Sequence, residues 1–171
     1  SYCNARCPGC PRNAYGYPLQ GFFDERNLKI DQLKDLLARF KDVKRILYCG
    51  NHGDPMMNPK IVELCTNNKH VSIATNGGIG RLDDYQRLAE IGTHITFGID
   101  GLQDTNHLYR QGVKWDNLMK RVETFISAGG QATWQFIRFK HNMKQVEQAE
   151  NLSKQMGFQN FFAMDVGRNN M

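Results

Sequence analysis

Short apolar segments alternate with amphipathic ones from about residue 29 to the end of this 171-residue chain. The segments rich in β-branched and aromatic residues are typical of strands and cover residues 45–49, 71–75, 94–99, 132–139 and 160–166. The remaining segments favour helices and cover residues 30–41, 59–65, 82–91, 115–128 and 143–156. Strands joined by helices lie parallel, because a parallel pair needs a long crossover connection. The sequence therefore predicts an α/β fold whose right-handed crossovers wind it into an open sheet or a barrel.

The predicted order is one helix, then four strand–helix units, then a last strand, so the first helix has no strand before it. We therefore expect a strand upstream of Ser1, and we interpret residues 1–171 as one domain that is part of a longer chain. In parallel α/β folds, ligands bind at the carboxyl ends of the strands. The residues that follow each strand are thus where we expect the chemistry.

The composition is that of an ordinary folded domain, with 40% hydrophobic residues, 23% charged residues and a net charge of +5. No apolar run approaches the roughly 18 residues that a membrane span needs, so we expect no membrane association. Lys and Arg are scattered along the chain. This pattern favours a solvated surface over a nucleic-acid-binding one.

Three of the five cysteines lie within eight residues, in the pattern C-x3-C-x2-C formed by Cys3, Cys7 and Cys10. Three thiolates on one short loop can each bind one iron of a four-iron cluster and leave the fourth iron open to another ligand. A structural zinc ion needs four ligands, and the spacing to Cys49 or Cys65 is not typical of such a site, yet zinc stays an alternative. We expect Cys49 and Cys65 to be small buried residues.

The stretch CNARCPGCPRN at residues 3–13 resembles the radical SAM superfamily, and most of all the branch whose members often carry a SPASM or twitch domain. The resemblance spans nearly the whole chain and implies a partial (β/α)6 TIM-like barrel that here lacks its first strand. It also implies a [4Fe–4S] cluster on Cys3, Cys7 and Cys10, with S-adenosylmethionine (SAM) as second cofactor. Gly9 departs from the pattern, because many members have a larger apolar residue there that packs against the adenine.

The segment Gly50–Pro55, GNHGDP, follows the first predicted strand and resembles the Gly-Gly-Glu-Pro motif of the superfamily. The resemblance implies that Asp54 binds the amino group of SAM, which a carboxylate can do through a charge-assisted hydrogen bond. Gly53 would allow close approach of the backbone, and Asn51 would contact the ligand. Asp54 is one methylene shorter than the usual Glu. The alternative is an ordinary Gly-Asp-Pro turn.

Three further strands supply the remaining predicted cofactor residues. Asn76, in Thr-Asn-Gly, resembles a strand end that lines the site in relatives. Asp100 and Arg110 resemble the fourth-strand signature, which implies that Arg110 binds the SAM carboxylate. Many relatives contact the ribose with a serine where this chain has Gly98, so that role falls to Asp100 or is lost. Arg138, inside the fifth strand, faces either the cofactor and substrate or the outer surface.

The resemblance implies reductive cleavage of SAM to a 5′-deoxyadenosyl radical that abstracts hydrogen from a substrate. It favours a peptide or protein substrate and leaves small molecules open. An electron donor such as flavodoxin or ferredoxin is implied, and the oxygen-sensitive cluster is expected in the cytoplasm. Two other functions stay open on the residues alone: an iron–sulfur electron-transfer or sensor module without SAM cleavage, and a zinc-stabilised binding domain.

Overall fold

The main sheet of the protein contains five parallel strands in the order β3–β4–β5–β6–β7. The structure is a computed structural model that describes residues 2–14, 17–18, 26–66 and 69–165. The strands are β3 (Arg45–Tyr48), β4 (His70–Thr75), β5 (His94–Gly98), β6 (Gln131–Ile137) and β7 (Asn160–Met164). Neighbouring strands are also consecutive in sequence, so each crossover moves the chain one position across the sheet in the same direction. The predicted parallel α/β fold is confirmed.

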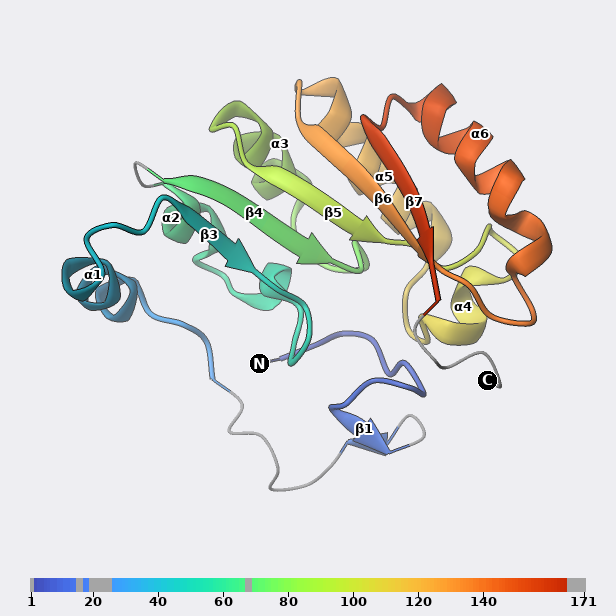
Figure 1. Ribbon diagram of the computed structural model, residues 1–171, viewed down its shortest axis with the longest axis horizontal. Helices are drawn as coiled ribbons and strands as arrows, with labels where there is room; N and C mark the ends of the chain where they lie inside the picture. The colour runs from blue at the N-terminus through green and yellow to red at the C-terminus, as the bar shows by residue number, and fades with distance from the viewer. Residues whose placement is uncertain (1, 15–16, 19–25, 67–68, 166–171) are drawn as a thin grey trace.

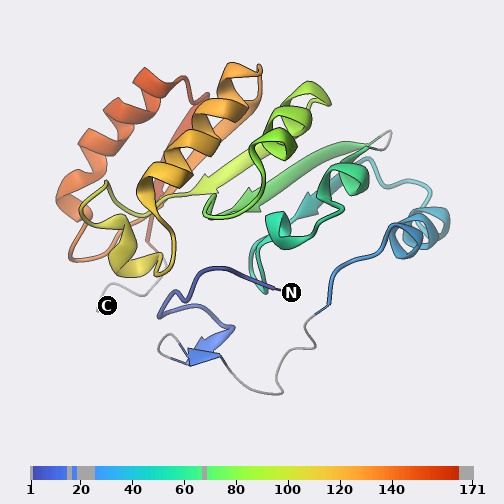
Figure 2. The ribbon, with the colours of Figure 1, turned by 180° about the vertical axis from the view of Figure 1, so that it is seen from behind.

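Helices follow the strands and cover one face of this sheet, as Figures 1 and 2 show. They are α2 (Ile61–Cys65), α3 (Leu82–Glu90), α5 (Trp115–Ser127) and α6 (Val146–Met156). Alternate strand residues point to this face, and Phe97 of β5 is fully buried there. Its ring lies 6.1 Å from that of Tyr85 in α3 and 6.0 Å from that of Phe125 in α5. Aromatic packing between sheet and helices therefore forms the centre of the core.

The opposite face of the sheet is formed by the strand residues that point away from the helices, and it borders the cavity described below. Near the strand ends these are Ala74 of β4, Thr96 and Gly98 of β5, Gln135 of β6 and Met164 of β7. Register places Thr96 beside Ala74, and Gln135 beside Gly98. The side chains are small, neutral or amide-bearing, and they line the cavity described below.

Shorter elements lie around the sheet. They are α1 (Ile30–Arg39), the 3-10 turns η1 (Pro55–Met57) and η2 (Met143–Gln145), the one-turn helix α4 (Asn106–Tyr109), and a small antiparallel pair β1 (Asn13–Ala14) and β2 (Tyr17–Pro18). The ten residues of α1 all stay at least partly exposed, although their apolar residues recur at helical spacing. They stay exposed because α1 lies at the edge of the molecule near β3, beside α2 (Figure 1).

The predicted elements are confirmed with small shifts at their ends. The helix expected over residues 143–156 begins as the η2 turn and becomes α-helical at Val146, and the last strand ends at Met164 rather than residue 166, which lies outside the described residues. The sequence did not predict α4 and η1, because a helical element of about one turn is too short to show helical periodicity. The described sheet is open, with β3 and β7 at its edges. A strand upstream of Ser1 stays a prediction. In the described ranges, no helix is long and apolar enough to cross a membrane.

Candidate functional site

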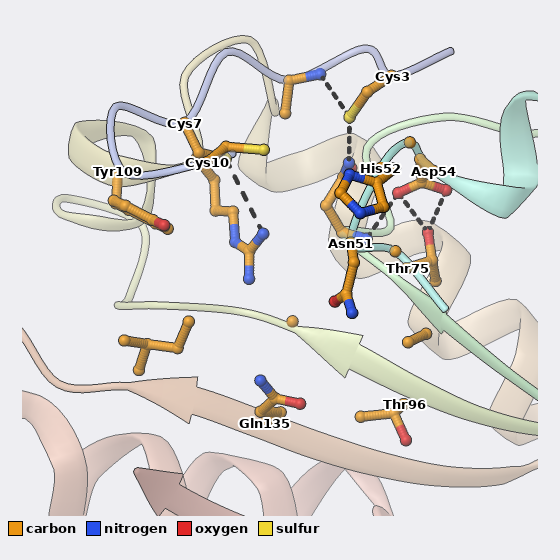
Figure 3. A pocket seen from close by; sticks show the side chains of 18 of the residues that line it. Cys3, Cys7, Cys10, Asn51, His52, Asp54, Thr75, Thr96, Tyr109 and Gln135 are labelled. Carbon is orange, nitrogen blue, oxygen red and sulfur yellow. Dashed lines mark hydrogen bonds between the residues drawn. The ribbon is translucent and has the colours of Figure 1, made fainter. Parts of the chain in front are cut away.

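A cavity of about 510 Å³ lies where the carboxyl ends of the strands meet the N-terminal cysteine loop (Figure 3). Its polar lining comes from the cysteine loop, from the loops after β3 and β4, from the sheet, and from Arg110, which follows α4. Parallel strands all end at this edge of the sheet, so segments far apart in sequence converge there. The cavity is therefore where the fold predicts a ligand.

Cys3, Cys7 and Cys10 all line this cavity. The chain turns tightly between the last two, because the amide of Cys10 donates to the carbonyl of Cys7 at 3.0 Å across Pro8 and Gly9. Burial raises the pKa of Cys3 to about 11 and also raises that of Cys7. Without metal these thiols hold their protons, and binding iron must release them.

The cysteine arrangement can be tested against the two metal groups that the sequence left open. Within residues 2–14, 17–18, 26–66 and 69–165, no three His, Cys, Asp or Glu side chains lie close enough to share one metal ion. A zinc ion needs its ligand atoms within about 2.3 Å of one point. In a four-iron cluster each thiolate binds a different iron, so the sulfurs need not converge. Three thiols around one cavity provide the ligand type and number that leave one iron of a four-iron cluster open.

Contacts from three directions hold the cysteine loop over the strand ends. The amide of Asp54 donates to the carbonyl of Tyr2 at 2.7 Å, and the amide of Arg6 donates to the carbonyl of Gln111 at 2.9 Å. The side-chain amides of Asn4 and Asn76 donate to each other at 3.3 and 3.0 Å. The Nδ2 of Asn76 also lies 3.7 Å from the Sγ of Cys3. Asn76 thus joins the β4 end to the cysteine loop.

Asp54 is a buried carboxylate at one wall of the cavity, with an exposed fraction of 6%. It accepts hydrogen bonds from the amides of Met56 and Asn76 at 3.0 and 2.8 Å and from the hydroxyl of Thr75 at 2.8 Å. Burial raises the pKa of Asp54, and these hydrogen bonds oppose that rise. The carboxylate therefore joins the loop after β3 to the end of β4, and contacts within the protein determine its position.

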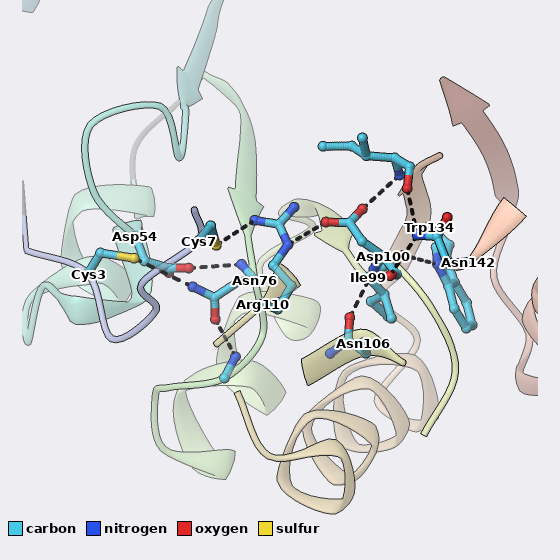
Figure 4. A network of polar contacts seen from close by, with 12 residues as sticks. Cys3, Cys7, Asp54, Asn76, Ile99, Asp100, Asn106, Arg110, Trp134 and Asn142 are labelled. Atoms are coloured by element: carbon cyan, nitrogen blue, oxygen red, sulfur yellow. Dashed lines mark hydrogen bonds and ion pairs between the residues drawn. The ribbon is translucent and has the colours of Figure 1, made fainter. Parts of the chain in front are cut away.

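Arg110 is the cation of the cavity, and its guanidinium lies between Asp100 and Cys7 (Figure 4). Its Nε forms an ion pair with Asp100 Oδ2 at 2.6 Å, and its Nη1 lies 3.9 Å from the Sγ of Cys7. Its guanidinium carbon lies 5.5 Å from the centre of the Tyr109 ring. Burial opposes the charge of Arg110, but Asp100 and Cys7 outweigh it and raise the pKa, so the guanidinium stays charged.

Asp100 lies behind Arg110 and outside the cavity lining, with its side chain fully buried. The amide of Ile137 donates to Asp100 Oδ1 at 2.7 Å, and the amide of Asp100 donates to Asn106 Oδ1 at 2.9 Å. The side-chain amide of buried Asn142 donates to the carbonyl of Asp100 at 2.9 Å. Asp100 therefore connects the end of β5 to β6, α4 and the loop after β6.

The structure thus brings most of the predicted site residues to one cavity, lined by Cys3, Cys7, Cys10, Asn51, Gly53, Asp54, Asn76 and Arg110. It places two of them elsewhere. Asp100 supports Arg110 from behind. Arg138 lies outside the lining and forms two exposed hydrogen bonds with Asp165, at 3.1 and 2.8 Å. Among the other cysteines, Cys65 is buried as expected, whereas the expectation for Cys49 is wrong, because it is exposed after an edge strand.

Several lining residues were not singled out as ligands from the sequence. Thr96 and Gln135 line the cavity from the sheet, together with Ile137 and Met164. The available signal was strand alternation, which puts every second residue on the inner face. Asn4 and Asn142 offered no such signal, because a buried amide that joins loops has no periodic neighbours.

Comparison of the sequence with known protein families gives a match to one family. The model of the radical SAM superfamily matches residues 1–160 of this chain. No curated protein matches the sequence. Three of the solved structures that are similar in fold illustrate the match. Streptococcus suis SuiB bound to the precursor peptide SuiA has a TM-score of 0.76 at 19% identity. Native anSMEcpe with bound AdoMet and the Kp18Cys peptide has a TM-score of 0.75 at 15% sequence identity. Methylornithine synthase (PylB) has a TM-score of 0.71 at 12% sequence identity.

Each of these matches covers 96% of the present chain. The chain spans 37% of the SuiB chain, 48% of the anSMEcpe chain and 50% of the PylB chain. At such identities the likeness concerns the fold, a parallel sheet with helices on its outer face, as in a partial barrel. The predicted partial TIM-like barrel is therefore confirmed.

Proposed function

Since this chain belongs to the radical SAM superfamily, we propose that it starts a radical reaction by cleaving SAM at a [4Fe–4S] cluster held by Cys3, Cys7 and Cys10. When bound, the two cofactors supply one-electron chemistry, in which reductive cleavage of SAM yields a 5′-deoxyadenosyl radical that abstracts hydrogen from the substrate. The observation that carries the proposal is the presence of three thiols, a buried carboxylate and a partly buried guanidinium around one cavity. These groups match a cluster and the two charged ends of an amino acid.

The opposite charges of Asp54 and Arg110 would bind the methionine part of SAM. Asp54 attracts an ammonium group, and Arg110 has two Nη groups with which to bind a carboxylate. Both side chains are already held by protein contacts, so little entropy is lost when the ligand binds. Asp100 serves as a positioning residue for Arg110, and we assign no cofactor contact to the exposed Arg138.

The cavity wall on the inner face of the sheet would adjoin the reacting part of the substrate. It consists of neutral groups, among them Thr96, Gln135, Ile137 and Met164. A wall without charged groups suits an uncharged carbon that gives up a hydrogen atom. Amide and hydroxyl groups there can also pair with peptide groups.

A peptide is the substrate class that we propose. Support comes from similarity in fold to SuiB, solved with the precursor peptide SuiA, and to anSMEcpe, solved with the Kp18Cys peptide. Similarity to methylornithine synthase keeps a small molecule as the second candidate. The reaction also needs an electron donor, for which we propose a small flavin protein or a ferredoxin.

Anaerobic reconstitution tests this function. We expect about four irons and four sulfides per chain, and 5′-deoxyadenosine after addition of SAM and dithionite. Cys7→Ala should lose both cluster and product, whereas Cys49→Ser, outside the cavity lining, should retain them. Iron without 5′-deoxyadenosine would indicate an electron-transfer or sensor module. Zinc alone would indicate a zinc-stabilised domain, and either result would refute the proposal.

A further inference from the structure

Gly98 is the last residue of β5 and faces the cavity beside Arg110. A Cβ atom built on Gly98 would lie 2.6 Å from Nη2 of Arg110 and 3.3 Å from its guanidinium carbon. Nonbonded carbon and nitrogen atoms do not approach so closely. The guanidinium therefore occupies the space that a side chain at position 98 would fill.

Arg110 is anchored at the Nε end of its guanidinium. Its Nε is paired with Asp100 at 2.6 Å, and Asp100 is fully buried and held by the amide of Ile137. On the other side, Nη1 lies 3.9 Å from the Sγ of Cys7. The guanidinium thus lies between a fixed carboxylate and the cysteine loop, and the backbone of Gly98 forms the floor beneath it.

We propose that Gly98 is a positioning residue for cofactor binding, because its missing side chain leaves the space from which Arg110 presents its Nη groups to the carboxylate of SAM. The inference rests on the proposed function, and it assigns a role to a residue that contributes no functional group of its own. A side chain at position 98 displaces the Nη groups towards Cys7, while the Nε of Arg110 keeps its pairing with Asp100. A bidentate contact depends on the orientation of the planar guanidinium, so a small displacement weakens it.

This displacement should leave the fold intact. The atom that Cβ would meet is the far end of a flexible side chain, and Gly98 is not among the glycines with positive φ, so alanine suits its backbone. The next nearest atom, the carbonyl oxygen of Thr75, is 3.7 Å away, an ordinary contact distance. Gly98→Ala therefore separates an effect on Arg110 from an effect on folding.

A double-mutant cycle on the reconstituted holoprotein tests the inference. SAM affinity is measured by equilibrium dialysis for the parent protein, Gly98→Ala, Arg110→Ala and the double variant, with iron content and melting temperature recorded for each. We expect Arg110→Ala to weaken SAM binding about tenfold to a hundredfold, the worth of a charge-assisted pair, and Gly98→Ala about tenfold. In the Arg110→Ala background, Gly98→Ala should change affinity by less than about twofold, because its effect acts through Arg110.

Crystal structures of the cofactor-free variants supply a second readout, in which Gly98→Ala should show the Arg110 guanidinium moved from the β5 end. An equal loss of affinity in both backgrounds would mean that position 98 acts on the ligand itself and would overturn the inference. Unchanged affinity in the single variant, or an unmoved guanidinium, would overturn it as well. Failure of the parent protein to bind SAM would instead refute the proposed function.

Discussion

The fully buried carboxylate of Asp100 and the partly buried guanidinium of Arg110 form an ion pair, with Oδ2 and Nε 2.6 Å apart. The pair joins the end of β5 to the residue that follows α4. Arg110 reaches from this pair to Cys7, so one charged contact connects the sheet to the cysteine loop. Contacts within the protein therefore hold the charged groups of the cavity in place.

Removal of the carboxylate charge should destabilise the protein. In Asp100→Asn, Arg110 stays charged in a largely buried position without its partner, and breaking such a pair costs about 3–5 kcal/mol. The free energy of unfolding, measured by urea denaturation, checks this. Asp165→Asn is the matched control, because Asp165 forms an exposed ion pair with Arg138 and its loss should leave the unfolding midpoint unchanged. Equal effects of both substitutions would contradict the burial of the Asp100 pair.

Asn142 should contribute to stability more than an ordinary loop residue does. It is fully buried, its Nδ2 donates to the carbonyls of Asp100 and Ile137 at 2.9 Å each, and its Oδ1 accepts from the amide of Phe139 at 2.7 Å. Asn142→Ala leaves three buried groups unpaired and should lower the free energy of unfolding by about 2–4 kcal/mol. Exposed Asn151 of α6 serves as control, and Asn151→Ala should have little effect. If both variants lost the same unfolding free energy, the buried hydrogen bonds of Asn142 would not contribute to stability beyond what an exposed asparagine does.

The hydroxyl of Thr75 should matter for both folding and SAM binding. It lies 2.8 and 2.9 Å from the two carboxylate oxygens of Asp54. It thus supplies a hydrogen-bond donor that water would supply to an exposed carboxylate. Thr75→Val keeps the shape and removes the donor, which should cost about 1–3 kcal/mol of stability and weaken SAM binding about tenfold. Denaturation and equilibrium dialysis measure the two effects. Thr124→Val, which removes an exposed hydroxyl bond within α5, should change neither, and an unchanged SAM affinity in Thr75→Val would argue against a role of Asp54 in binding.

Cys65 should make the protein less stable in alkali. Burial raises the pKa of its thiol from 9.0 to about 12 in the folded protein. Between these values the unfolded chain loses the proton that the folded chain keeps, so the stability that the buried thiol contributes falls as pH rises above 9. Well above pH 9 and below pH 12, the free energy of unfolding should fall by about 1.4 kcal/mol per pH unit because of this thiol.

Unfolding free energies of the parent protein and Cys65→Ala, compared from pH 8 to pH 10, check this dependence. The parent should lose about 1.4 kcal/mol more than the variant by pH 10, whereas other titrating groups contribute equally to both. Parallel curves would show that the Cys65 thiol is not sheltered from water in the folded state.

Sequence periodicity was enough to predict the five strands, the covering helices and their parallel order, because these follow from the local spacing of apolar residues. The C-x3-C-x2-C spacing and the polar residues after the strands likewise predicted which loops form the cavity. Such features are local, and strand ends in a parallel sheet converge whatever the details of packing.

Side-chain direction and partnership depended on the tertiary structure. Asp100 and Arg110 are both prominent in the sequence, yet only the tertiary structure, in which the Asp100 amide bonds to Asn106 of α4, pairs them with each other and places Asp100 outside the cavity lining. Arg138 pairs with Asp165 outside the site, and the bare backbone of Gly98 becomes the floor under a guanidinium. The spacing of residues along one segment decides which element forms, but contacts between segments distant in sequence decide which groups meet.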